Sequence, residues 1–163
     1  MIASYKAILA SLLAAMTVAQ GVAAESHTVR FTNKCGRGTP TLRNQQGKVL
    51  STGGDFKSNG PLIGAIAYLQ TGNCGANGEG CTLIETTLRN PTTPGSGSSS
   101  DISLIPPHKF SVASGFKYFN GCDGQGADCK DQNCKTAFHK PTDTNVQVAC
   151  QTNDAGLNII FCD

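Results

Sequence analysis

Short segments in which apolar and polar residues alternate run along most of this sequence, separated by glycine, proline and asparagine. Residues 82–88 and 101–110 have strand length, β-branched content and flanking breakers, so they predict two strands. Segment 62–69 fits a strand or a short helix, and its length, glycine and tyrosine favour a strand. The same pattern predicts strands at 27–32, 40–43, 48–51, 110–119, 145–150 and 156–162. Because no segment after residue 24 keeps a 3.6-residue period, the chain is predicted to be an all-β sandwich.

The two central predicted strands each carry one carboxylate. Side chains alternate across a strand, so Glu85 faces away from the core if Ile84 faces it, and Asp101 does so if Ile102 faces the core. The two acids then share one open face of a sheet, and they are the one acid pair in the sequence with a chemical interpretation. The ordinary alternative is two solvated carboxylates on the wet side of a sheet.

The first 24 residues have the pattern of a secretory signal peptide. Lys6 precedes an apolar run over residues 7–19, and small residues end the segment at Val22, Ala23 and Ala24. The run is too short for a membrane span and no later run replaces it, so no membrane partner is expected. Cleavage after Ala24 leaves residues 25–163 as one secreted, extracellular domain, expected to be a monomer. Within that domain, residues 89–100 are rich in Ser, Gly and Pro and predict a flexible surface loop.

The charge balance argues against nucleic acid and anionic membranes as partners. The chain has 13 Lys+Arg against 11 Asp+Glu, and removal of Lys6 leaves 12 against 11, a formal charge of +1, with the signs interspersed. No cofactor or metal is expected, because His27, His108 and His139 do not pair at metal-ligand spacing. The serines also lack the setting of a hydrolase nucleophile.

Eight cysteines lie after the predicted signal peptide. An even number in a secreted chain predicts a disulfide framework. A zinc site is disfavoured because Cys129 and Cys134 have no good second pair. Eight cysteines allow 105 pairings, so the sequence alone does not choose among them.

Four pieces of sequence together carry a resemblance to a known family. They are the opening Phe31–Cys35, the pair 82–88 with 101–104, Gly121–Cys122 with Cys129 close behind, and the ending from Cys150 to Ile160–Cys162. In this order they resemble the thaumatin-like (pathogenesis-related family 5) proteins over most of the chain after residue 24. The length is similar to that of the small members, in which the cysteine-rich second domain is missing. Residues 28–81 also resemble small secreted proteins of basidiomycete fungi.

The resemblance implies a disulfide pairing and a site. The implied pairs are Cys35–Cys162, Cys74–Cys81, Cys122–Cys150 and Cys129–Cys134. Larger relatives have an acidic cleft proposed to bind, and sometimes to hydrolyse, β-1,3-glucan, and its Glu and first Asp match Glu85 and Asp101. Gln70 stands where the cleft's Arg would fall, Pro106 stands where its next Asp would fall, and the last Asp belongs to the missing domain.

The resulting functional hypothesis is non-catalytic binding of a cell-wall polysaccharide, β-1,3-glucan first, in wall biology or antifungal defence. Glu85, Asp101 and Tyr118 are the candidate ligand-binding residues, with Tyr118 either stacking on a sugar or packing in the core. One alternative is a weak endo-β-1,3-glucanase, with Glu85 as the acid and Asp101 as the base or nucleophile. Another is a protein-binding module, such as an enzyme inhibitor or a host-interacting protein with a secreted partner.

Overall fold

The structure, a computed structural model, describes residues 24–163, so the predicted signal peptide lies outside the described residues except for Ala24. The described chain contains twelve strands and no helix. The strands are β1 (Ser26–Asn33), β2 (Thr39–Arg43), β3 (Val49–Ser51), β4 (Phe56–Asn59), β5 (Leu62–Gln70), β6 (Leu83–Leu88), β7 (Ser98–Ser103), β8 (Ser114–Phe119), β9 (Gly126–Cys129), β10 (Ala137–Phe138), β11 (Val148–Cys150) and β12 (Gly156–Phe161).

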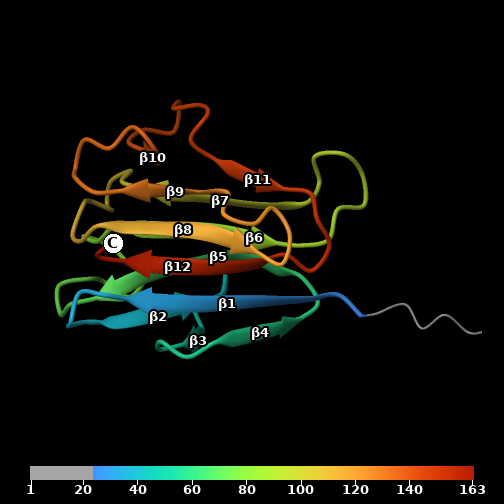
Figure 1. The fold of residues 1–163 in the computed structure, drawn as a ribbon. Coiled ribbons are helices and arrows are strands. Elements are labelled where there is room, and N and C mark those ends of the chain that lie inside the picture. The colour runs from blue at the N-terminus through green and yellow to red at the C-terminus, as the bar shows by residue number, and fades with distance from the viewer. Residues whose placement is uncertain (1–23) are drawn as a thin grey trace, which may run out of the picture.

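Two sheets face each other and form a β-sandwich. One has five strands in the order β4-β1-β12-β8-β9, and the other has seven, β10-β7-β6-β5-β2-β3 with β11 also paired to β7. In Figure 1 the strands β1, β12 and β8 lie nearer the viewer, in front of β5 and β6. The prediction of an all-β sandwich is therefore confirmed.

The core fills the space between the sheets. Val29, Ile84, Ile102, Phe116 and Ile159 are all inaccessible or nearly so, and they come from both sheets. Ile84 and Ile102 are directly opposed across β6 and β7, as the alternation of the two segments predicts. Burial of these side chains fixes the strand register, because a slip of one residue would turn every core side chain outward.

A short polar chain crosses the core. The hydroxyls of Thr86 and Ser100 lie 2.7 Å apart, and the Tyr118 hydroxyl lies 3.0 Å from both Ser100 Oγ and the Val148 carbonyl oxygen. Since a carbonyl only accepts, the Tyr118 proton is donated to Val148. Every member of this chain is hydrogen-bonded, as a buried polar group requires.

Four disulfides hold the sandwich, and their pairing is the one that the family resemblance implies. Cys35–Cys162 joins the end of β1 to the end of β12, which are parallel neighbours. The other three close shorter loops: Cys74–Cys81, Cys122–Cys150 and Cys129–Cys134. The described chain has no free cysteine.

Several predicted boundaries were wrong. The strand predicted at 101–110 is β7, which ends at Ser103 because Pro106 and Pro107 cannot donate to a ladder and His108 N closes a turn onto the Ile105 carbonyl. The predicted loop 89–100 is shorter, since Ser98–Ser100 belong to β7 and pair with both β6 and β11. The strands β4, β9 and β10 were not predicted, because segments of two to four residues are too short to show an alternation.

Candidate functional site

The strands β6 and β7 place Glu85 and Asp101 directly opposite each other. They are Cα partners in the antiparallel register and lie on the face of the seven-stranded sheet that points away from the core. Opposed residues have Cβ atoms about 5 Å apart. The structure therefore brings together the two carboxylates that the sequence singled out.

Asp101 occupies a gap on the far edge of β7. That edge pairs with β11 over Ser98–Ser100 and with β10 over Ile102–Ser103, which leaves Asp101 between the two short partners. Gln147, just before β11, reaches across this gap, and its Nε2 donates to Asp101 Oδ2 at 3.4 Å. Only 7% of Asp101 is exposed, whereas Glu85 is exposed. The face is therefore half covered, which corrects the prediction that both acids lie on an open surface.

One oxygen of Asp101 has no partner. Oδ1 is buried and makes no hydrogen bond within the described residues. No described ion pair includes Asp101 or Glu85. A buried carboxylate oxygen without a donor is costly when ionised, and such atoms are rare in folded proteins.

Burial, and then the neighbouring charge of Glu85, raises the pKa of Asp101 from 3.8 to about 6, while the Gln147 hydrogen bond acts weakly in the other direction. Asp101 is thus the carboxyl with the raised pKa. This arrangement favours Asp101 over Glu85 as a proton donor, the reverse of the roles expected from the sequence. The cover that raises the pKa comes from the segment before β11, which sequence reasoning did not place here.

A small polar pocket lies over the acid pair, with a volume of about 120 Å³. Besides the acids, its polar lining includes Thr87, Ser99 and Gln147. At its rim, β5 is bulged between Leu62 and Ala65, and the Gly64 amide donates to Thr87 Oγ1 at 3.1 Å. We call this the acid pocket. It is smaller than the roughly 300–1,000 Å³ of typical small-molecule sites.

The stacking role considered for Tyr118 is corrected by the structure. Tyr118 is 2% exposed and lies between the sheets, where its hydroxyl belongs to the polar chain of the core. Burial raises the pKa of Tyr118 to about 12. Tyr68 is equally buried, its hydroxyl donating to the Ala76 carbonyl, and the sequence has no tryptophan. No Tyr or Trp ring of the described chain is therefore presented to a sugar.

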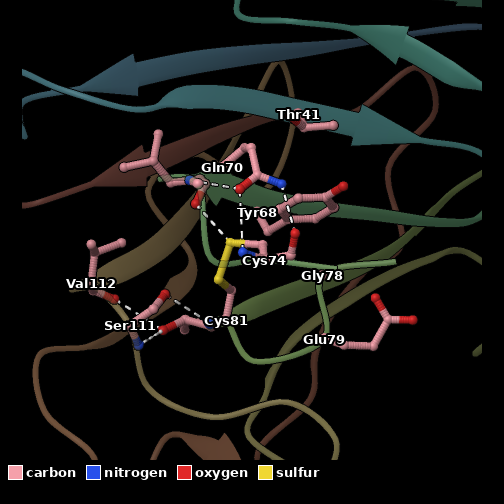
Figure 2. Close-up of a disulfide and its surroundings, with 12 residues drawn as sticks. Thr41, Tyr68, Gln70, Cys74, Gly78, Glu79, Cys81, Ser111 and Val112 are labelled. Atoms are coloured by element: carbon pink, nitrogen blue, oxygen red, sulfur yellow. Dashed lines mark hydrogen bonds between the residues drawn. A yellow bond between two sulfur atoms is a disulfide. The ribbon is translucent and has the colours of Figure 1, made fainter. Parts of the chain in front are cut away.

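Gln70, which stands where the family's Arg would fall, forms hydrogen bonds to the turn that follows it. Its Nε2 donates to the Cys74 carbonyl at 2.9 Å, and its Oε1 accepts from the amides of Gly72 and Cys74 at 2.8 and 3.2 Å. Figure 2 shows these bonds beside the Cys74–Cys81 disulfide. The Gln70 amide therefore fixes this turn, and it supplies no positive charge to the acid pocket.

The acid pocket also contains residues that sequence reasoning missed. Gln147 comes to the site only because β11 and β7 pair, over a separation of about fifty residues, whereas Ser99 lies two residues before Asp101 on the same face of β7. Nothing in the sequence near Gln147 signals this contact. Ser99 was missed because it lies in residues 89–100, which were predicted to be a flexible loop.

Neither a metal-ligand cluster nor a membrane-spanning helix is found in the part of the chain that the structure describes. No three His, Cys, Asp or Glu side chains of residues 24–163 are grouped so that they could hold a metal ion. Within the same residues, no helix is long and apolar enough to cross a membrane.

Comparison with models of known protein families finds none that matches this chain, and no curated protein matches it. The thaumatin-like resemblance therefore rests on the sequence motifs alone.

Proposed function

We propose that this chain is a secreted, small thaumatin-like protein that binds a wall polysaccharide, β-1,3-glucan first, without hydrolysing it. The observation that carries the proposal is the acid pocket, where an exposed and a covered carboxylate lie side by side with free acceptor capacity. Sugar hydroxyls are donors for such oxygens. The four disulfides are compatible with an extracellular protein.

Ligand entry requires only a small change at Gln147. Its 3.4 Å bond to Asp101 is long, and Gln147 itself is exposed. A sugar hydroxyl that replaces the Gln147 amide would form a shorter bond to the same oxygen. Glu85, on the open side, accepts a second hydroxyl without any movement of the backbone.

The shape of the site favours binding over hydrolysis. A glycosidase places its two carboxyl groups on either side of the scissile bond, about 5 to 10 Å apart. Here both acids rise from neighbouring strands of one sheet, and the acid pocket of about 120 Å³ is too small to enclose a sugar ring. Without exposed Tyr or Trp rings, each contact with a chain of sugars is weak, and retention depends on many contacts along an insoluble polymer.

A weak glucanase is the second candidate, because one specific observation favours it. The raised pKa of Asp101, beside an exposed Glu85, is the asymmetry that acid–base pairs need. In that case Asp101 donates the proton and Glu85 acts as the base or nucleophile.

The test is a pull-down of the oxidised, secreted protein on insoluble β-1,3-glucan, with chitin and cellulose as control polymers. We expect selective retention on glucan that is lost in the Glu85→Ala/Asp101→Ala double variant. Asp55→Ala, which removes an exposed acid elsewhere, is the matched control and should bind normally. A reducing-sugar assay on the same samples separates binding from hydrolysis. If no polymer retains the protein, the polysaccharide proposal is refuted and a protein partner becomes the next candidate.

A further inference from the structure

A second pocket, of about 380 Å³, shares no lining residue with the acid pocket. Three loops meet there: the β1–β2 loop at Arg37, the segment after β5 at Thr71 and Asn73, and the β7–β8 connection at Lys109 and Ser111. Its volume falls within the range of small-molecule sites. We call it the loop pocket.

The walls of the loop pocket are tied together. The Cys74–Cys81 disulfide closes one wall, and the Lys109 amide donates to the Cys81 carbonyl at 3.3 Å. Thr82 and Ser111 exchange two bonds, from each backbone amide to the other's hydroxyl oxygen, at 3.1 and 3.0 Å. Figure 2 shows Ser111 beside Cys81 in this arrangement. These bonds hold the walls of the loop pocket in place before any ligand binds.

The backbone of the β1–β2 loop, which carries Arg37, is also held by a hydrogen bond. Arg37 lies between Gly36 and Gly38, both at positive φ, and Asn33 Nδ2 donates to the Arg37 carbonyl at 3.0 Å. The backbone of this loop is thus fixed by Asn33, while the guanidinium stays exposed.

All the charge that lines the loop pocket is positive. Arg37 and Lys109 are its charged residues, and neither takes part in the four ion pairs of the described chain. The Lys109 side chain lies over the disulfide loop, since its Cε is 3.8 Å from where a Cβ at Gly80 would be. Two cations at one pocket without a counter-charge repel each other, and a bound anion removes that repulsion.

The polar lining supplies donors as well. The side chains of Thr71 and Asn73 make no hydrogen bond within the described residues, and Ser111 Oγ only accepts, so its proton is free. The half-buried ring of Phe110 adds an apolar surface. We propose that the loop pocket binds an anionic sugar, in which a carboxylate or sulfate meets Arg37 and Lys109 while the sugar body meets these donors and Phe110.

Another pocket offers a contrast. It lies in the segment 133–146 and also has two lysines, Lys135 and Lys140, but Asp143 shares its lining and supplies a negative charge. The loop pocket has no such acid, which makes it the better anion site. Lys135 therefore provides a matched control for removal of a pocket lysine.

The test is calorimetric titration of the oxidised protein with four probes: glucuronate, glucose 6-sulfate, inorganic sulfate and glucose. We expect both anionic sugars to bind and glucose not to bind. Arg37→Gln and Lys109→Gln should each weaken binding about ten-fold or more, because each removes a charged hydrogen-bond donor. Lys135→Gln and the Glu85→Ala/Asp101→Ala variant should bind normally, so this result is independent of the polysaccharide proposal. Arg37 and Lys109 are exposed, and thermal unfolding checks that the variants remain folded.

Backbone amide shifts in a ¹H–¹⁵N spectrum locate the site, and we expect changes at Thr71, Gly80 and Ser111. Equal binding of glucose, unchanged affinity in both Gln variants, or shifts confined to other loops would overturn the anion site. Inorganic sulfate that binds as tightly as glucose 6-sulfate would overturn the assignment of a sugar.

Discussion

Asp101 is the residue whose replacement tests the description of the acid pocket most directly. The residue is 7% exposed, one oxygen of its carboxyl has no partner, and it lies opposite Glu85 across β6 and β7. We expect Asp101→Asn to stabilise the protein at neutral pH and to change its stability little near pH 4. The variant keeps the shape of the side chain, removes the charge, and adds an amide that can donate to Glu85.

The magnitude follows from the pKa of Asp101, which burial and Glu85 raise from 3.8 to about 6. At about 1.36 kcal/mol per pH unit, this difference corresponds to an upper limit of about 3 kcal/mol. Solvent at the rim of the acid pocket screens the repulsion from Glu85, so we expect a gain of about 1–2 kcal/mol.

The sign of the pH dependence follows from proton linkage. Because the folded-state pKa is raised, the folded protein holds this proton more tightly than the unfolded chain does. The free energy of unfolding therefore carries no penalty from Asp101 below about pH 3.8. The penalty grows as the pH rises to about 6 and is constant above that value.

Urea denaturation with the disulfides intact, at pH values between about 4 and 8, measures this effect. The difference in unfolding free energy between Asp101→Asn and the parent should grow up to about pH 6 and stay constant from there to about pH 8. Asp55→Asn, at an exposed acid paired with Arg30, is the control and should show no such gain. If Asp101→Asn destabilises the protein equally at every pH, the carboxylate is well solvated when ionised, and the account of the acid pocket is wrong.

Three further predictions concern the framework and the site. The Cys35→Ala/Cys162→Ala variant should lose about 5 kcal/mol of unfolding free energy, since this bridge spans 127 residues, and a loss under about 1 kcal/mol in denaturation would contradict the loop-closure argument. Tyr118→Phe should cost about 1–3 kcal/mol because it removes a hydroxyl that bonds the buried Ser100 Oγ and the part-buried Val148 carbonyl, and an unchanged urea midpoint would show that the core hydroxyl chain contributes nothing. Gln147→Ala should lower the pKa of Asp101, because loss of the covering side chain reduces the burial that is the main cause of the raised value and outweighs the loss of one long hydrogen bond, and an NMR titration of the carboxyl carbon that moves toward higher pH would refute this.

The sequence could predict the sandwich because its evidence is local. The alternation in 82–88 and in the start of 101–110 states which side chains are buried, and Ile84 and Ile102 are indeed core partners. From that alternation, the outward direction of Glu85 and Asp101 followed without any knowledge of the rest of the chain. The family resemblance added the disulfide pairing, which the sequence alone left open.

The environment of Asp101 could not be predicted in this way. It depends on which segments pair with the far edge of β7. Those are β10, which was not predicted, and β11, whose strand was predicted at 145–150 without any indication of its partner. Gln147 is brought to Asp101 by this non-local pairing, across 46 residues of sequence. Propensity and periodicity contain no information on such a contact. The covering of Asp101 by Gln147, the raised pKa of Asp101 and its assignment as the proton donor in place of Glu85 therefore follow only from the structure.

A physical reason connects the cost of Asp101 to the proposed function. A carboxylate that is covered but incompletely hydrogen-bonded destabilises the fold, and a simple surface acid would avoid that cost. The hydrogen bond from Gln147 to Asp101 Oδ2 is long, and Asp101 Oδ1 has no partner. A hydrogen-bond donor of a ligand can therefore bind to either oxygen. A donor that completes the hydrogen bonds of Asp101 recovers part of the energy that burial costs, and this recovered energy adds to affinity. Asp101 should therefore lower the stability of the unbound protein and increase its affinity for the polymer. Asp101→Asn should separate the two effects, because it should raise stability and lower retention on the polymer.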